Sequence, residues 1–405
     1  MQSGTGKISG MWVYGAFACM AIAAAVFLFN LRFMLDARPP DFSQKTLLQA
    51  VWHHYKSEYL EQGTLRSLDK DQGGVTTSEG QSYIMLRSVW IDDKATFDIA
   101  WQWTKDNIQR KGDHLMSWLF GERPDGSYGV LTDRGGENTA SDADIDIALS
   151  LLFASKRWGS DTYFGDAIGI IRDIWDREVV IISGKPYLLA NDVEKQTSKK
   201  VLVVNPSYFA PYAFKAFKQA DPDHDWLGLA STSYDVALES VKDPLDKASS
   251  AGLPPDWIGM DRDTGAIVSL SRAANVTTNF SFDALRLPWR FALDWEWNKD
   301  PRAKAVLDAL GYLSSEWSGH KGIAYAYAHD GSRLTDSESA AMYGGTIGYF
   351  MASDPSKAKE VYLSKLDALY DPNESTWRSP LSYYDENWAW FGMALYAGEL
   401  RNLYE

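Results

Sequence analysis

Three acidic residues at alternate positions open an apolar segment with helical spacing, in the stretch TASDADID at residues 139–146. Asp142, Asp144 and Asp146 fit the first three ligand positions of a calcium-binding loop. The sixth position of such a loop needs glycine and the twelfth needs glutamate, but this sequence has Ile147 and Phe153 there. The stretch is therefore not predicted to bind calcium.

A helix start explains part of this acidity. Ser141 and Asp144 have the spacing of a capping box, and acidic side chains in a first turn suit the helix dipole. Asp142 and Asp146 lie four residues apart, so on a helix their carboxylates share one face and repel each other. We therefore expect a positive or hydrogen-bonding group to face them, and a polyhydroxylated ligand would serve.

Two further acids lie in segments that could carry proton-transfer chemistry. Glu79, in VTTSEGQSYIM, precedes a helical pattern, and an exposed acid beside a helix cap is the simpler interpretation. Asp283, in NFSFDALRLPW, has Arg286 three residues later, which predicts an ion pair on a helix. A carboxylate beside an arginine also stays ionised at neutral pH, as a general base must. Tyr208, in NPSYFAP, is held between prolines and is either a presented phenol or a packed helix-start residue.

Composition argues against several classes of function. The net charge of −14 and the lack of a long basic block exclude a nucleic-acid partner. The single cysteine, Cys19, allows no disulfide, and the six histidines show no metal-ligand spacing. Aromatic residues make up 14% of the chain, which fits either a tryptophan-rich core or flat platforms for sugar rings.

The chain divides into an N-terminal segment, residues 1–40, and one long domain, residues 41–405. Residues 11–29 are uncharged and about as long as a bilayer-spanning helix. A membrane anchor is favoured over a cleaved signal peptide, because no good cleavage site follows the apolar run. Either alternative places the domain outside the cytoplasm, in the periplasm or the extracellular space, and cleavage would make it a secreted protein.

About a dozen amphipathic helices are predicted in the long domain, so the fold class is all-α. They cover Lys45–Tyr59, Ser82–Val89, Ala95–Asn107, Ile145–Trp158, Phe164–Trp175, Tyr208–Phe217, Trp226–Val241, Ala284–Trp295, Arg302–Glu316, Ser337–Met351, Ala358–Leu369 and Trp388–Tyr404. Short β-prone segments such as VVIISGKPYLL and KKVLVVNP occur between them. Six helical hairpins closed into an α/α barrel fit this pattern, as would an irregular bundle or solenoid.

Several of these motifs together resemble glycoside hydrolase family 8. ASDADIDIALSLLFASKRWG is similar to the family signature, and SEGQSYIM to its SEGQSYGM-like segment, with Ile84 in place of glycine. FDALRLPW is similar to the family's YDAxRxPW, with Phe282 in place of tyrosine. NPSYFAP and YYDENWAWFGMALY also match, and the motifs follow the family order from Glu79 to Tyr396.

The resemblance implies an (α/α)6 barrel that hydrolyses β-1,4-linked glycans with inversion, without a metal or an organic cofactor. It implies the following roles: Glu79 as general acid, Asp283 as general base, Asp142 as a further active-site acid, Tyr208 and Arg286 as residues that position the water, and Trp118 as a sugar platform. Asp144 is placed with the substrate-binding residues, and Asp146 is expected to be structural.

Two classes of function follow from the resemblance. The first is an inverting endo-β-1,4-glucanase acting on cellulose or a related exopolysaccharide, held by its anchor near a polysaccharide synthase or export complex. Chitosanase, xylanase and mixed-linkage glucanase activities stay open, because one barrel supports several sugars. The second is a non-catalytic polysaccharide-binding assembly factor, which predicts that the acid or the base is lost.

Overall fold

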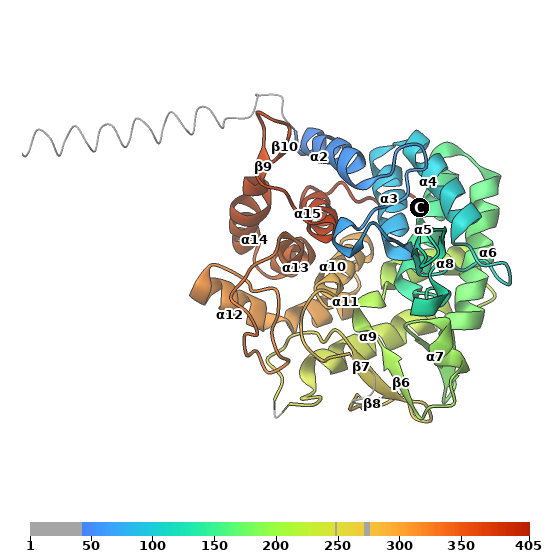
Figure 1. Cartoon of the computed structure of the whole chain (residues 1–405). Coiled ribbons are helices and arrows are strands. Elements are labelled where there is room, and N and C mark those ends of the chain that lie inside the picture. The colour runs from blue at the N-terminus through green and yellow to red at the C-terminus, as the bar shows by residue number, and fades with distance from the viewer. Residues whose placement is uncertain (1–42, 248, 271–275) are drawn as a thin grey trace, which may run out of the picture.

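The inner layer of the protein consists of six helices with few exposed side chains. The structure is a computed structural model that describes residues 43–405 except 248 and 271–275 (Figure 1). The inner helices are α3 (Ser78–Ile91), α5 (Ser141–Trp158), α8 (Pro211–Ala220), α10 (Arg286–Asn298), α13 (Ala340–Ser353) and α15 (Tyr383–Tyr396). Each packs against the next in this order. The fold of the described chain is therefore mostly helical, as the periodicity predicts.

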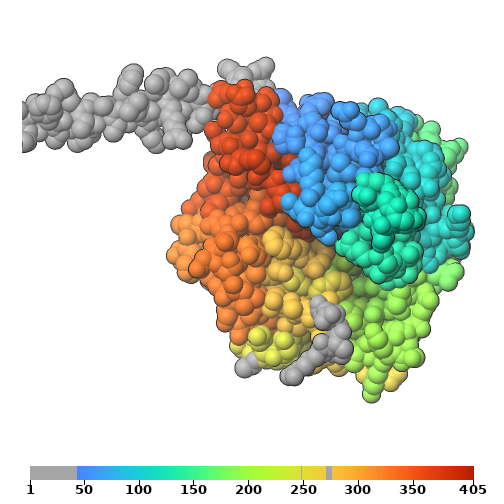
Figure 2. Space-filling view, in the orientation of Figure 1, coloured from blue at the N-terminus to red at the C-terminus, as the bar shows by residue number. Residues whose placement is uncertain are grey.

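The last inner helix also meets the first. The indole Nε1 of Trp388 on α15 donates to the hydroxyl of Tyr83 on α3, at 3.2 Å. Arg87 on α3 donates to the amide oxygen of Asn387 on α15, at 2.9 Å. In Figure 2, the blue segment that begins the described chain and the red segment near its end lie side by side on one face. The inner helices thus form a closed ring.

Shorter or more amphipathic helices cover the ring from outside. They are α2 (Gln44–Tyr59), α4 (Lys94–Asn107), α6 (Asp161–Glu178), α9 (Trp226–Lys242), α11 (Pro301–Asp308) and α14 (Pro355–Val361), with α7 (Asp192–Gln196) and α12 (Gly311–His320) beside them. Pairs such as α3 with α4, α5 with α6 and α8 with α9 are sequential neighbours in contact. Helical hairpins therefore repeat along the chain.

Small antiparallel sheets connect the helices, so the all-α prediction is too simple. They comprise β1 (Thr76–Thr77) with β2 (Leu119–Glu122) and β3 (Tyr128–Val130), β4 (Val179–Ile182) with β5 (Lys185–Leu188), β6 (Val201–Val204) with β7 (Ile258–Asp261) and β8 (Ile267–Val268), and β9 (Tyr370–Asp371) with β10 (Thr376–Trp377). The two β-prone segments noted in the sequence form β4, β5 and β6. Sheets at loop positions satisfy backbone groups that the helices leave unpaired.

Two local predictions are wrong. The segment Arg302–Glu316 is not one helix, because the chain breaks between α11 and α12. The expected capping box at α5 is not formed: Ser141 donates to the carbonyl oxygen of Leu189, and Asp144 accepts the backbone N–H of Met116. At α5, contacts with distant segments replace the local cap.

The predicted anchor in residues 11–29 lies outside the described residues. Within the part of the chain that the structure describes, no helix combines the length and apolar character needed to span a bilayer.

Candidate active site

The N-terminal ends of the inner helices bring the predicted residues together at one end of the ring. Glu79 lies in the first turn of α3, which begins after Thr77, whose hydroxyl caps the helix by accepting the N–H of Gly80. Asp142 lies in the first turn of α5, and Arg286 is the first residue of α10. Glu79 and Arg286 are 207 residues apart in sequence, so only the closed ring makes them neighbours.

One buried guanidinium contacts three carboxyl groups. Nη1 of Arg286 donates to Glu79 and also to Asp142, the latter at 2.8 Å, while Nη2 donates to Asp283. Arg286 is 2% exposed, whereas the side chains of Glu79 and Asp283 are 24% and 32% exposed. The two predicted proton-transfer residues therefore lie on different nitrogens of one arginine and reach solvent from it.

Burial raises the pKa of Glu79 to about 7, Arg286 opposes this shift, and the charges of Asp142 and Asp283 add to it. One positive charge cannot neutralise three carboxylates. The carboxyl group whose charge is least stabilised, Glu79, therefore binds a proton near neutral pH. A carboxyl that is protonated near neutral pH and open to solvent is suited to general acid catalysis.

Asp283 is held as a hydrogen-bond acceptor on both oxygens. Its Oδ1 accepts from Asn205 Nδ2 at 3.0 Å and from Arg286, and its Oδ2 accepts from the indole Nε1 of Trp257 at 3.0 Å. The ion pair predicted between Asp283 and Arg286 is present, and the arrangement suits a general base.

Tyr208 lies beside this cluster, at the end of a short 3-10 helix over Pro206–Tyr208. The Arg286 guanidinium lies 5.0 Å from the centre of its ring, and the Trp257 ring meets it edge-on at 5.9 Å. Burial, together with the charges of Asp142 and Asp283, holds the pKa of Tyr208 well above its usual value. The phenol therefore stays protonated, as a residue that hydrogen-bonds to an attacking water requires.

The partners of Asp142 and Asp146 are two arginines rather than a ligand. Asp142 is paired with Arg286, and Asp146 forms a two-pronged pair with Arg290 at 2.8 and 2.9 Å. The spacing of four residues on α5 matches the same spacing on α10, so both repelling acids find a cation. Asp142 is only 3% exposed. It acts on the cluster by pairing with Arg286 and by the effect of its negative charge on the pKa of Glu79. The structural role expected of Asp146 fits this geometry.

The two predicted substrate-binding residues differ in position. Trp118 is partly exposed, and its carbonyl accepts the N–H of Ser78, next to the acid. Its indole donates to the carbonyl of Gly135 at 2.9 Å, which fixes the ring. Asp144 is fully buried and binds the backbone of Met116, so it supports the Trp118 segment, and its position gives no support to substrate contact.

A cavity of 380 Å³ opens at this cluster. It is lined by Asp69, Gln72, Thr77, Glu79, Phe282, Asp283, Arg286, Ser382, Tyr383, Tyr384 and Asp385. A second hollow of 360 Å³ shares Gln72 with it and continues past Arg123 and Arg134. Gln72 therefore borders both hollows.

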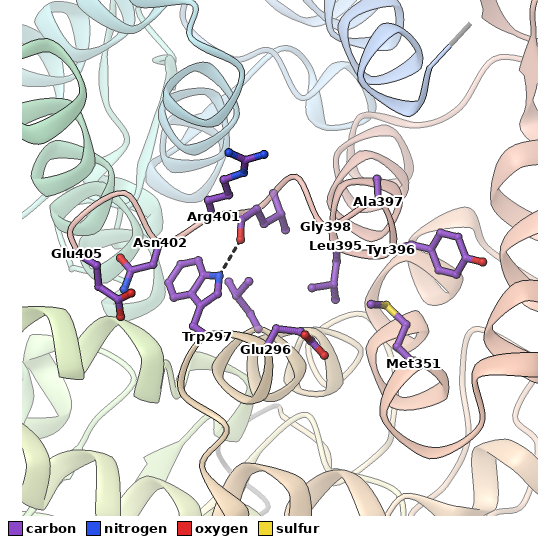
Figure 3. Close-up of a pocket in the computed structure, with 12 residues that line it drawn as sticks. Glu296, Trp297, Met351, Leu395, Tyr396, Ala397, Gly398, Arg401, Asn402 and Glu405 are labelled. Atoms are coloured by element: carbon purple, nitrogen blue, oxygen red, sulfur yellow. Dashed lines mark hydrogen bonds between the residues drawn. The ribbon is translucent and has the colours of Figure 1, made fainter. Parts of the chain in front are cut away.

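A larger cavity, 540 Å³, lies elsewhere and contains none of these residues (Figure 3). It is lined by Trp297, Met351 and Leu395, near the C-terminal ends of α10, α13 and α15. The cluster lies at the N-terminal ends of α10 and α15, and the rise of α10 from Arg286 to the cavity residue Trp297 is about 16 Å. The smaller cavity is therefore the candidate active site.

The sequence profile of glycosyl hydrolases family 8 matches residues 29–394. This chain belongs to that family. Endoglucanase A of Acetivibrio thermocellus is 31% identical over 325 residues, which cover 78% of this chain but 63% of the relative. The chain thus spans less than two thirds of that enzyme.

Solved structures agree on the fold. The endo-1,4-D-glucanase from Vibrio fischeri ES114 superimposes with a TM-score of 0.72 at 24% identity, covering 85% of this chain and 94% of that one. The β-1,3-1,4-glucanase from Paenibacillus sp. X4 has the same TM-score and identity, with 90% and 95% covered.

Three residues that hold Asp283 or its backbone carried no prediction. Asn205 lies within the NPSYFAP segment, and its place before Tyr208 was the available signal. Trp257 and Asp256 lie in PPDWIG, which has no pattern that points to chemistry, so only the fold reveals them. Within the described residues no three metal-binding side chains are grouped to hold an ion.

Proposed function

We propose that this protein is an inverting endo-β-1,4-glucanase of the family. One observation carries the proposal: Glu79 and Asp283 share a guanidinium and face one cavity, and burial raises the pKa of Glu79 to about 7. Glu79 therefore holds a proton near neutral pH, and Asp283 accepts hydrogen bonds from Asn205, Trp257 and Arg286. Two carboxyl groups in such different surroundings can take the separate roles of acid and base.

The mechanism follows from the roles of Glu79 as acid and Asp283 as base. Glu79 protonates the oxygen that leaves with the departing sugar, and Asp283 takes a proton from a water that attacks the opposite face of the sugar ring. Inversion needs the two carboxyl groups about 6.5–9.5 Å apart, so that this water fits. Tyr208 and Arg286 hold the water beside Asp283, and Asp142 keeps Arg286 in place while its charge raises the pKa of Glu79.

An aromatic wall beside Asp283 supports a sugar substrate. Phe282 is 42% exposed and lines the cavity, with its ring stacked on Tyr325 at 5.3 Å and meeting Tyr384 edge-on at 5.9 Å. An exposed, buttressed ring offers a flat apolar surface, which is one of the two alternatives that the aromatic content left open. Two hollows that share Gln72 leave room for a chain that extends past the site, as internal cleavage requires.

The choice of β-1,4-glucan rests on the relatives, whose names include endoglucanase and endo-1,4-D-glucanase. Mixed-linkage glucan is the second candidate, because the Paenibacillus β-1,3-1,4-glucanase has the same fold. Xylan and chitosan remain further alternatives. A non-catalytic assembly factor is disfavoured, since it would not need to keep both Glu79 and Asp283.

The finer architecture and setting are also part of this proposal. The closed ring of inner helices with its outer helices supports an (α/α)6 barrel of six hairpins. The apolar run at residues 11–29 supports a membrane-held enzyme whose catalytic domain lies outside the cytoplasm, near a polysaccharide synthase or export complex.

A reducing-end assay on four polymers tests the function. Carboxymethylcellulose, mixed-linkage glucan, xylan and chitosan are compared for the native chain, Glu79→Gln and Asp283→Asn. We expect turnover on carboxymethylcellulose that both substitutions abolish. Turnover on xylan or chitosan alone would replace the substrate assignment, and full activity of either variant would refute its assigned role.

A further inference from the structure

The base is presented by the ends of two neighbouring strands. β6 and β7 pair with Val204 opposite Ile258, so the residues just outside the pairing, Asn205 and Trp257, lie at the same end of this sheet. Both donate to Asp283, one to each oxygen, at 3.0 Å. The sheet therefore fixes the direction in which the Asp283 carboxylate points.

Asp256, the residue before Trp257, holds the backbone beneath this carboxylate. Its Oδ1 accepts the N–H groups of Ser281, Asp283 and Ala284 at 3.1, 3.2 and 2.8 Å. Its Oδ2 accepts the Ser281 hydroxyl. Three N–H groups that converge on one oxygen define the turn from residue 281 to 284, which carries the base into α10.

Asp256 does not touch the cavity. It is 4% exposed, and the cavity-lining residues include Asp283 and Phe282 but not Asp256. The charge that acts on it most strongly is that of Asp283. Its contacts are with the turn itself, which separates its role from that of Asp142, the other buried acid of the site.

We propose that Asp256 is a positioning residue for the general base: by gathering the N–H groups of Ser281, Asp283 and Ala284 it keeps the Asp283 carboxylate between Asn205, Trp257 and Arg286. This inference rests on the proposed function, in which Asp283 activates the water. A displacement of about 1 Å at a reacting group lowers a rate on the order of 100-fold, so the turn has to be held rigidly.

The electrostatics favour asparagine as a mimic of this residue. Burial, and then the charge of Asp283, raise the pKa of Asp256 to about 7. At mildly acidic pH the carboxyl is therefore neutral, and asparagine reproduces both its charge and its Oδ1 acceptor. Alanine removes the Oδ1 acceptor, so the N–H groups of Ser281, Asp283 and Ala284 lose this hydrogen-bond partner.

The test compares Asp256→Asn and Asp256→Ala in the native chain and in an Asp283→Asn background, with kcat and KM measured at pH 6 on a soluble cellooligosaccharide. We expect Asp256→Ala to lower kcat about 100-fold with KM changed less than threefold, and Asp256→Asn to stay within tenfold of the native kcat. In the Asp283→Asn background, Asp256→Ala should reduce the residual rate less than threefold, because the general base that Asp256 positions is already absent.

A substrate with a dinitrophenol leaving group adds a readout that a merely structural role would not move. Such a leaving group needs no proton, so Glu79→Gln should recover on it, while Asp256→Ala should stay impaired as Asp283→Asn does. Recovery of Asp256→Ala on this substrate would overturn the proposal, as would a native-like kcat or full additivity with Asp283→Asn.

A further variant covers the case in which Asp256→Ala does not fold. Asp256→Glu keeps the carboxyl but moves its oxygen, so its kcat should fall at least tenfold below that of Asp256→Asn; equal rates would refute the positioning role. Failure of the proposed function is distinguishable, because it would appear as normal turnover in Asp283→Asn itself.

Discussion

At the residue scale, the site consists of one arginine among three acids. Arg286 contacts Glu79, Asp142 and Asp283, and its positive charge cannot balance all of them. Glu79 carries the excess proton because burial raises its pKa to about 7. The same contacts leave Asp283 surrounded by donors.

The pH profile tests this assignment of the proton. Glu79 acts only when protonated, so kcat/KM should fall as the pH rises through about 7, the value to which burial raises the pKa of Glu79. Glu79→Gln should lower kcat by about 10²–10⁴-fold, and its residual activity should lack this alkaline limb. Glu374→Gln, at an exposed loop position, is the control and should keep the native profile. An unchanged alkaline limb in Glu79→Gln would assign the proton to another group.

How far the sequence predicts these residues depends on the range of their contacts. The repulsion between Asp142 and Asp146 is local, and it led us to expect a positive or hydrogen-bonding partner; the partners are Arg286 and Arg290. The support given by Trp257 and Asp256 was not predictable, because the pairing of β6 with β7 creates it. Asp144 was predicted to bind substrate, but its side chain is buried. Its hydrogen bond to the backbone of Met116 could not be predicted, because it joins segments far apart in sequence.

At the element scale, a buried ion pair joins three inner helices. Arg290 on α10 donates to both oxygens of Asp146 on α5 and, at 2.8 Å, to the hydroxyl of Tyr212 on α8. Removing one partner leaves an uncompensated buried charge. The pair therefore holds these helices in register one turn below the site.

Asp146→Asn should lower the free energy of unfolding by about 3–5 kcal/mol, measured by urea denaturation. The double variant Asp146→Leu with Arg290→Met should regain most of this loss, because no lone charge remains buried. Asp308→Asn, which breaks an exposed pair with Lys304 on α11, should cost below about 1 kcal/mol. Equal losses for Asp146→Asn and Asp308→Asn would contradict the structural role of the pair.

A histidine links the first described helix to the last. His54 on α2 contacts Glu386 on α15 at 3.2 Å, and this hydrogen bond raises the pKa of His54 above its usual 6.5. A raised pKa in the folded state means that the stabilisation is fully present below pH 6.5 and is lost as the pH rises through the folded value.

The melting temperature should therefore respond to His54→Gln in a pH-dependent way. The difference in Tm from the native chain should be larger at pH 5.5 than at pH 9. The neighbouring His53 is exposed, so His53→Gln serves as the matched control, with little effect at either pH. A loss for His54→Gln that does not change with pH would assign its effect to packing alone.

Helix positions follow from sequence better than helix ends do. The apolar spacing placed α2, α4 and α9 almost at their observed bounds. The division between α11 and α12 was missed, because the apolar spacing continues across it and only the packed structure shows the break. The strands β4, β5 and β6 were visible as β-prone segments, but their pairings were not.

At the scale of the whole molecule, closure of the ring creates the site. Tyr83 and Arg87 on α3 bond to Trp388 and Asn387 on α15, which joins the two ends of the helical series. Only in this closed arrangement do Glu79 and Asp283 share Arg286. Periodicity alone left a barrel, a bundle and a solenoid open, and the resemblance to the family is what favoured a barrel.

The anomeric form of the fresh product tests the central claim most directly. NMR spectra recorded during hydrolysis of a soluble β-1,4-glucan should show the α-anomer at the new reducing end before mutarotation, because Asp283 directs water to the face opposite Glu79. A β-anomer formed first would contradict the account, since it would require a covalent intermediate and another role for Asp283.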